Sequence, residues 1–192
     1  MGGAPSRNKI AKGFEESISL SATGYFKGYQ TNMDWEKEEG NAFLYYVYGA
    51  ACSEVEVDCL TGAHKLLRAD IIMDAAFSIN PALDIGQIEG AFIQGMGFSA
   101  TEELKYSPEG VLYSRSPDHY KIPTVTEIPE EFYVTLVRSR NPIAVYSSKE
   151  VGEAGMFLGS SMLFAIYDAV AAACRERGLT KTFVLSSQQP LN

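Results

Sequence analysis

The sequence has little positive charge and no long apolar run. Its 192 residues include 16 Lys and Arg against 24 Asp and Glu, which gives a net charge of −8. A nucleic-acid-binding domain needs a basic surface that neutralises phosphates, and an anionic membrane also attracts basic rather than acidic segments. No uninterrupted run of about 18 apolar residues is present, so we expect no bilayer-spanning segment. We therefore expect neither nucleic acid nor a membrane as a partner.

Cysteine and histidine are also scarce. The three cysteines, Cys52, Cys59 and Cys174, include no Cys-x-x-Cys pair, and there are only two histidines. Such a set fits neither a disulfide framework nor a zinc or iron–sulfur site, so we expect no metal ligand from the protein itself. We interpret the cysteines as small buried hydrophobic residues in a reducing cytoplasm. The N-terminus lacks the apolar segment of a secretion signal, which agrees with a cytoplasmic location.

The overall composition is that of a folded domain. Hydrophobic residues make up 46% of the chain and charged residues 21%, which is close to the average for globular proteins. A chain of this length can bury a sizeable core. We therefore expect a single folded unit over residues 1–192, with disordered ends at 1–7 and 183–192.

Hydrophobic periodicity predicts a mixed α+β fold. Residues 52–58 alternate with period two, as a half-exposed strand does, and a turn at 60–64 leads into a second strand, which predicts a hairpin. A proline-containing loop is expected at 105–128. The expected strands cover 43–48, 52–58, 65–74, 132–137 and 143–146, and the expected helices cover 8–23, 84–97 and 154–177.

The start of the helix at 84–97 has two interpretations. Asp84 followed by Gln87 has the spacing of a capping box, which satisfies the free amides of a helix start. The four glycines of this helix, however, each cost roughly 0.5–1 kcal/mol relative to alanine, which is tolerated where a ligand or another backbone must come close. One helix face would then present two amides separated by small residues to a flat polar ligand: Gln87, Gly90, Ala91 and Gln94.

A second helix start carries Glu153. A carboxylate at a helix N-terminus is stabilised by the helix dipole, and this structural explanation applies equally to Glu150. The residues after Glu153 are apolar on nearly all sides, so we expect that helix to be buried and Glu153 to be partly desolvated. A desolvated carboxylate at the mouth of a buried helix is a candidate general base.

Four segments of the sequence form long, ordered matches to a known family: YGAACSEVEVDCLTG at 48–62, INPALDIGQIEGAFIQGMG at 79–97, YKIP at 120–123 and SKEVGE at 148–153. They resemble the C-terminal part of the xanthine dehydrogenase/aldehyde oxidase family, and the resemblance covers about residues 14–180. Three further segments, at 35–40, 146–149 and 155–159, look more like aldehyde oxidases than xanthine dehydrogenases.

The resemblance implies the second half of a molybdenum-cofactor-binding domain. By the same resemblance, Glu153 corresponds to the glutamate that takes a proton from the molybdenum-bound hydroxide, in an enzyme that oxidises aldehydes to carboxylic acids and hydroxylates N-heteroaromatic rings. Gln87 corresponds to a glutamine near the pterin, and Val151 to a backbone position close to the cofactor. We add Gly152 and Gln94 as cofactor-binding candidates, so the expected cofactor is molybdopterin with molybdenum.

The resemblance also implies parts that these residues lack. Family enzymes carry iron–sulfur clusters and FAD in preceding domains, and as full-length proteins they are expected to be homodimers. The chain alone is therefore expected to be inactive and to need those N-terminal domains as partners. Two alternatives remain open: a purine hydroxylase like xanthine dehydrogenase, and a truncated fragment without catalytic function.

Overall fold

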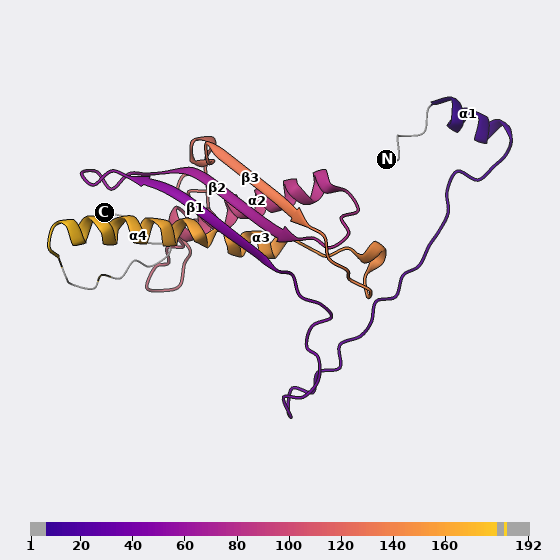
Figure 1. The fold of residues 1–192 in the computed structure, drawn as a ribbon, viewed down its shortest axis with the longest axis horizontal. Coiled ribbons are helices and arrows are strands. Elements are labelled where there is room, and N and C mark those ends of the chain that lie inside the picture. Colours follow the sequence, from indigo (N-terminus) through magenta and orange to yellow (C-terminus); the bar gives the residue numbers. More distant parts are fainter. Residues whose placement is uncertain (1–6, 180–182, 184–192) are drawn as a thin grey trace. The chain divides into compact units, whose positions relative to one another are not determined.

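A computed structural model describes residues 7–179 and residue 183 (Figure 1). The chain divides into two compact units, residues 1–30 and 31–192, and each is described by itself. The first unit contains helix α1 (Arg7–Glu15), which is shorter than the predicted helix at 8–23. It ends because Ser17 adopts a left-handed conformation with φ +55°. The expectation of disordered ends concerns mainly residues 1–6 and 184–192, which lie outside the described residues.

The second unit is built on a three-stranded sheet in the order β1-β2-β3. Strand β1 (Gly49–Val57) pairs with β2 (His64–Asp74) in an antiparallel hairpin, as the sequence predicted. Strand β3 (Glu131–Val137) lies parallel to β2 on its other side, and Figure 1 shows the three strands side by side. The sheet is therefore mixed, in agreement with the expected α+β class.

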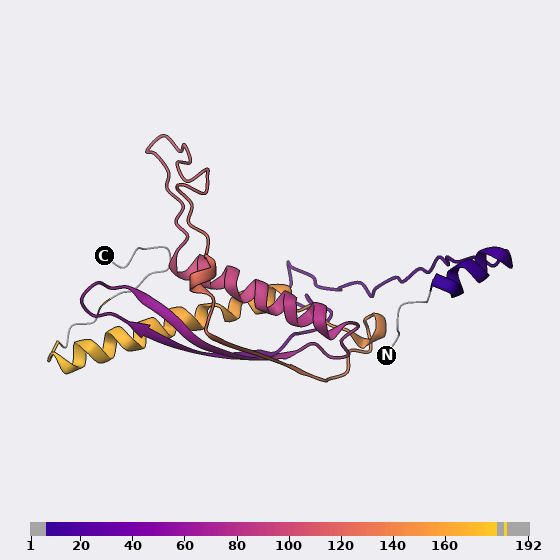
Figure 2. The ribbon, with the colours of Figure 1, turned by 90° about the horizontal axis from the view of Figure 1, so that it is seen from above.

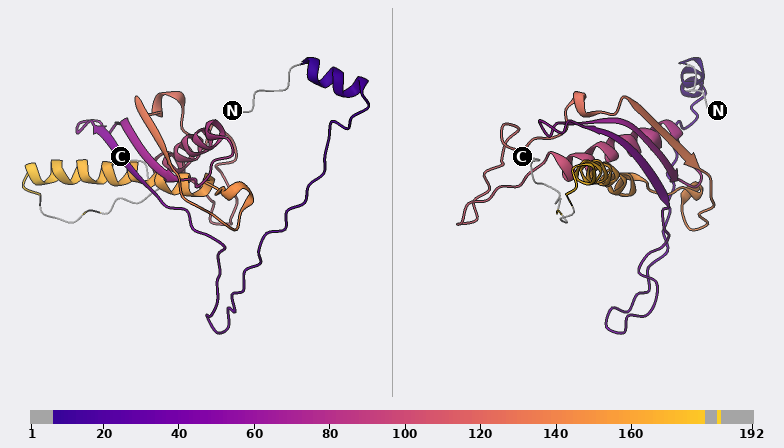
Figure 3. Two further views of the ribbon diagram at one scale, coloured as in Figure 1. Left: turned by 45° about the vertical axis from the view of Figure 1, so that its right-hand side comes forward. Right: turned by 60° about the vertical axis from the view of Figure 1, so that its left-hand side comes forward.

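One face of the sheet carries the helices. In β2 every second side chain at its C-terminal end is fully buried, as shown by Ala69, Ile71 and Met73 with 0–1% exposure. Helices α2 (Pro81–Ala100) and α4 (Ser160–Glu176) pack against this face, and Figure 3 shows both on the same side of the strands. Between them in the chain comes the short helix α3 (Gly152–Leu158), which contacts α2 and β1.

Helix α2 begins earlier than the sequence predicted. Its N-cap is Asn80, whose side-chain oxygen accepts a hydrogen bond of 3.2 Å from the amide of Ala82, and Pro81 occupies the first helical position. The expected capping box of Asp84 and Gln87 was wrong. Asp84 instead accepts a hydrogen bond from the hydroxyl of Ser78, so the Gln87 side chain is not needed for capping.

Two predicted strands do not form. Residues 43–48 lack a paired strand in the described part of the chain, and residues 143–146 lead into a 3-10 turn, η2 (Val145–Ser147). Asn141 holds this turn through two hydrogen bonds: its backbone amide donates 2.6 Å to the hydroxyl oxygen of Ser147, and its side-chain amide donates 2.9 Å to the carbonyl of Ser148. Aromatic and β-branched residues favour a strand only where a neighbouring strand offers a ladder.

The predicted loop at 105–128 is confirmed apart from one 3-10 turn, η1 (Val125–Glu127). Figure 2 shows its first part projecting from the body of the second unit. The hydroxyl of Tyr120 in this loop donates a hydrogen bond of 2.5 Å to Glu102, which lies directly after the end of α2. This bond, together with burial, raises the pKa of Tyr120.

The predicted helix at 154–177 exists as α3 and α4, but the expectation that it is buried on nearly all sides was wrong. Phe157 is 79% exposed and Phe164 is 65% exposed, whereas only Met162 and Ile166 of α4 are buried. The cause is geometric, because a single sheet face can cover only one side of a helix. Gly178, with φ +70°, ends the helix as predicted.

Two further observations bear on the expectations from the sequence. The segment Gly152–Glu176, with a mean hydropathy of 1.6, is long and apolar enough to cross a membrane by length and composition, although helices that pack in a protein core have the same properties. The cysteines are not buried: Cys52 and Cys59 are exposed and Cys174 is half-buried. Cys52 lies on the outer side of β1, away from the helices, and Cys59 lies in the hairpin turn.

Candidate active site at the crossing of two glycine-containing helices

Helices α2 and α3 approach each other through glycines. A β-carbon on Gly95 would lie 1.9 Å from the carbonyl oxygen of Met156, and one on Gly159 would lie 2.5 Å from the carbonyl oxygen of Phe92. A β-carbon on Gly155 would come within 3.3 Å of the Cα of Ile88. Since alanine would not fit at Gly95 or Gly159, close backbone contact accounts for part of the glycine content that the sequence could not explain.

The same crossing brings Gln87 next to Gly152. A β-carbon on Gly152 would lie 3.0 Å from Nε2 of Gln87, so the amide of Gln87 lies over the first residue of α3. Val151, the N-cap of α3, is 3% exposed and belongs to the hydrophobic core. Three of the predicted cofactor-binding residues, Gln87, Val151 and Gly152, are therefore neighbours although 64 residues separate Gln87 from Val151 in the sequence.

Glu153 is the second residue of α3 and points away from the core. Its side chain is exposed, and in the described part of the chain no hydrogen bond or ion pair engages its carboxylate. The first turn of a helix favours a negative charge through the helix dipole, as the structural explanation required. The helix dipole therefore explains why a charge is tolerated at this position. The carboxylate remains available to accept a proton.

Glu153 lines a cavity of about 440 Å³ beside the helix crossing. Among the described residues that line it, Glu153 is the one with a charged side chain, and the others are mostly apolar or small. Such a mostly apolar pocket with one convergent polar group is the usual form of a small-molecule site. The other lining residues are Gly95, Phe98, Ser99, Met156, Phe157 and Ser160.

Sequence reasoning did not identify these other lining residues, although helical spacing could have found them. Met156, Phe157 and Ser160 follow Glu153 at intervals of three, four and seven, which places them on one helix face. Phe98 and Ser99 follow Gly95 at intervals of three and four. The missing information was that these two faces meet, because the crossing of α2 and α3 is a tertiary contact.

Gln94 and the remaining glycines of α2 lie outside this cavity. Gln94 is exposed, and a β-carbon on Gly86 or Gly90 would meet nothing within 4 Å. Packing within this chain therefore does not explain why these two helix positions are glycine. Ala91, predicted to share their face, packs instead against Gly155 of α3.

Lys149, four residues before Glu153, forms a buried ion pair with Asp74. Nζ of Lys149 is 2.5 Å from Oδ2 of Asp74, and the two side chains are 8% and 11% exposed. Burial alone would raise the pKa of Asp74, but hydrogen bonds from Lys149 and the amide of Ala76 outweigh it and hold that pKa below its ordinary value. Asp74 is therefore ionised at neutral pH.

A family profile described as a molybdopterin cofactor-binding domain matches residues 2–129. The chain belongs to this family. Among curated relatives, aldehyde oxidase 4 of Rattus norvegicus is 83% identical over 178 residues, which are 93% of this chain and 13% of the relative. Aldehyde oxidase 2 of Mus musculus is 68% identical over 182 residues, or 94% of this chain and 14% of the relative. The chain thus spans about one seventh of the length of these relatives.

Solved structures of molybdenum-family enzymes share its fold. Quinoline 2-oxidoreductase from Pseudomonas putida 86 is 28% identical with a TM-score of 0.58, and the match covers 62% of this chain and 15% of that one. Aldehyde oxidoreductase from Desulfovibrio gigas has a TM-score of 0.60 at 23% identity, over 69% of this chain and 14% of that one, which shows the fold alone. The predicted fold and family are confirmed.

Proposed function

We propose that this chain is the Glu153-bearing part of a molybdenum hydroxylase that oxidises aldehydes to carboxylic acids and hydroxylates N-heteroaromatic rings. Its similarity to proteins named aldehyde oxidase supports the first substrate class. The similarity to a quinoline oxidoreductase supports the second. One observation carries the proposal. The Glu153 carboxylate, which has no partner among the residues that the structure describes, lies at the wall of a mostly apolar cavity, beside the contact of Gln87 with Gly152.

The residues around this contact suit molybdopterin with molybdenum. Gln87 and Gln94 expose amides on α2, and Gly86 and Gly90 leave the surface between and beside them open to a flat polar group. Gln87 and Gln94 would hydrogen-bond the pterin, while the backbone of Val151 and Gly152 would lie along it. When bound, the cofactor supplies the two-electron oxidation of the substrate carbon. Iron–sulfur clusters and FAD, which would carry the electrons onward, belong in this proposal to the rest of the enzyme.

Glu153 is the base in this proposal. Its carboxylate has no partner within the described residues, so it can accept a proton without first breaking a hydrogen bond. The aromatic side chains of Phe98 and Phe157 would lie against an apolar substrate and keep water away from the carboxylate. A general base held in this way contributes on the order of 10²–10⁴-fold to a rate.

The proposed partners are the other domains of the same enzyme. The exposed side chains of Phe157, Phe164 and Phe98 are large apolar surfaces that water covers poorly, and contact with those domains would bury them. A homodimer of the full-length enzyme and a cytoplasmic location complete the proposal. The alternative of a non-catalytic fragment rests on the chain covering only 13% of its relative.

A chimera tests the proposal. We define the test enzyme as aldehyde oxidase 4 of Rattus norvegicus in which the 178 matching residues are replaced by those of this chain. The test enzyme is expected to bind molybdenum stoichiometrically by elemental analysis and to oxidise an aromatic aldehyde, with hypoxanthine turned over poorly. Faster turnover of hypoxanthine would support the purine alternative. A test enzyme without molybdenum would support the non-catalytic fragment.

A further inference from the structure

We propose that the buried pair of Lys149 and Asp74 positions Glu153. The pair ties the segment that precedes α3 to the end of β2, and through this segment it sets where the Glu153 carboxylate lies. The inference rests on the proposed function of Glu153 as a base. It assigns to two residues outside the cavity a role that packing of the helices alone does not provide.

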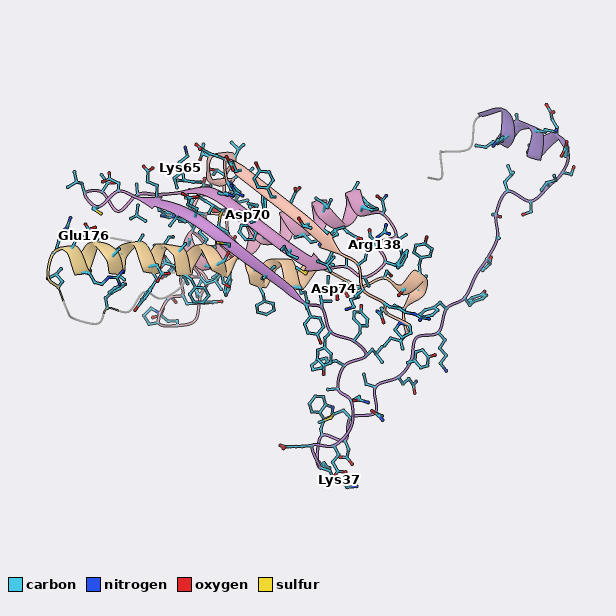
Figure 4. The ribbon with its side chains drawn as sticks, in the orientation of Figure 1. Lys37, Lys65, Asp70, Asp74, Arg138 and Glu176 are labelled. Carbon is cyan, nitrogen blue, oxygen red and sulfur yellow. The ribbon has the colours of Figure 1, made fainter. Side chains whose placement is uncertain are left out.

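The pair joins a rigid strand to a loop. Asp74 is the last residue of β2, whose neighbours Met73 and Ala75 are buried, and Figure 4 shows it at the end of the sheet opposite Lys65. Lys149 lies in the loop that leads into α3. The ammonium group of Lys149 also lies 5.5 Å from the centre of the Tyr48 ring, a cation–π contact that keeps the side chain in place.

The carboxylate of Asp74 bridges two backbone segments. Its Oδ2 accepts from Lys149, and its Oδ1 accepts 3.0 Å from the amide of Ala76, a residue with φ +50°. Ala76 in turn forms an antiparallel bridge with Ser148. A left-handed alanine is an unfavourable backbone conformation, and the hydrogen bond from its amide to Asp74 stabilises it.

Backbone hydrogen bonds extend this bridge. The amide of Phe77 donates 3.0 Å to the carbonyl of Ser147, and the amide of Lys149 donates 3.3 Å to the carbonyl of Ala75. On the other side of the loop, the hydroxyl of Tyr45 accepts 3.3 Å from the amide of Glu150. The loop is therefore held from both sides immediately before Val151, the N-cap of α3.

The pair acts on Glu153 from the N-terminal side of α3, together with the backbone hydrogen bonds that hold the loop. Helix α3 has seven residues, and its glycine contacts with α2 fix the helix from Gly155 onward. The carboxylate of Glu153 has no partner of its own in the described residues, so its position follows that of the backbone.

A buried ion pair is a costly way to gain stability alone. Two apolar side chains of similar size would serve stability as well or better, because both charges lose their water. The charged pair adds directional hydrogen bonds. Because the Asp74 carboxylate accepts from Lys149 and from the amide of Ala76, it fixes the loop before α3 and the end of β2 in one arrangement. This geometric role explains why charges occupy the site.

The test compares two neutralised pairs in the test enzyme. The double variant Asp74→Asn/Lys149→Met removes the buried pair without leaving an unpaired buried charge. The control Lys65→Met/Glu130→Gln removes an exposed pair at the other end of the sheet, with side chains 54% and 58% exposed. We expect kcat per bound molybdenum to fall by about 100-fold in the first variant, as for a small misplacement of a catalytic group, and to stay unchanged in the control.

Two further readouts separate positioning from general stability. In the double variant, KM for the aldehyde is expected to change little, and hydrogen exchange at the amides of 150–155 is expected to become faster while exchange in β2 remains slow. A wild-type kcat per molybdenum would overturn the proposal. A loss of molybdenum or of thermal stability with kcat per molybdenum unchanged would also overturn it, since the role would then be structural only.

Asp74→Glu decides the matter should the double variant fail to accumulate. It keeps both charges but moves the carboxylate by one methylene, so kcat per molybdenum is expected to fall about tenfold with the enzyme folded, and a wild-type value would overturn the proposal. Glu153→Gln separates failure of the positioning role from failure of the proposed role of Glu153 as the base. If Glu153→Gln is inactive while the pair variants are normal, only the positioning role fails; if Glu153→Gln is active, the base itself is wrong.

Discussion

The amide of Gln87 lies over Gly152, so close that a β-carbon at Gly152 would come within 3.0 Å of Nε2. This contact joins the two segments that carry the proposed cofactor contacts, one at the start of α2 and one at the start of α3. Because the far end of a flexible side chain can move aside, a larger residue at Gly152 would displace the amide and leave the fold intact.

Gly152→Ala in the test enzyme is therefore expected to lower molybdenum content several-fold while changing thermal stability little. The added methyl would push the Gln87 amide away from the position proposed for the pterin. Elemental analysis of purified protein measures this. Gly24→Ala is a matched control, because a β-carbon there meets nothing within 4 Å, and molybdenum content equal to that of the control would contradict the proposed role of Gln87.

Gly95→Ala is expected to destabilise the fold. Its β-carbon would lie 1.9 Å from the carbonyl oxygen of Met156, a backbone atom, so helices α2 and α3 would have to separate. Overpacking of this kind costs about 3 kcal/mol, which is a large share of typical domain stability. Thermal unfolding of the test enzyme measures the effect. Gly86→Ala, whose β-carbon faces open space, is expected to leave stability unchanged or slightly higher.

The Asp74–Lys149 pair predicts an acid-dependent stability. The pKa of Asp74 is lowered in the folded state, so its contribution is fully present above the ordinary value of 3.8 and is lost as the pH falls through the lower folded-state pKa. Melting temperatures of wild type and Asp74→Asn/Lys149→Met, compared from pH 7 downward, are expected to differ by a constant amount until about pH 4 and to converge below it. A difference that stays constant through acid would show that Asp74 is not ionised in the fold.

The isolated chain is expected to associate through its exposed helix face. Phe157 and Phe164 are 79% and 65% exposed, so Phe157→Ser/Phe164→Ser should reduce aggregation, as measured by light scattering of the purified 192-residue protein. Exposed positions contribute little to folding, so far-UV circular dichroism should not change. Phe92→Ser is the opposite case. Phe92 is fully buried, and the centre of its ring lies 5.3 Å from that of Phe132, so this substitution should unfold the chain.

Much of the fold followed from the sequence because local patterns decided it. The alternation at 52–58 gave a strand of the hairpin, and Gly178 ended the last helix as predicted. The failures came from long-range contacts. Residues 43–48 have strand-forming side chains, but they form no strand ladder with the described part of the chain. Asn80 rather than Asp84 caps α2, and the Asp84 carboxylate accepts a hydrogen bond from Ser78 instead.

The candidate site was predicted in part. Gln87 and Glu153 were identified by resemblance, and the structure brings Gln87 against Gly152, whereas Gln94 lies outside the cavity. The pair of Asp74 and Lys149 could not have been predicted, because 75 residues separate the two and no sequence motif indicates that they form a pair. The lining residues of α2 and α3 were visible as helix faces but not as one pocket.

The central claim is tested most directly by Glu153→Gln in the test enzyme, measured as kcat per bound molybdenum for aldehyde oxidation. The amide keeps the shape of the side chain but cannot act as a base, so we expect the rate to fall by about 10²–10⁴-fold with molybdenum content nearly unchanged. Glu150, an exposed glutamate in the loop just before α3, provides the control, and Glu150→Gln should retain the wild-type rate. A Glu153→Gln enzyme that keeps more than about a tenth of the wild-type rate would contradict the role of Glu153 as the base.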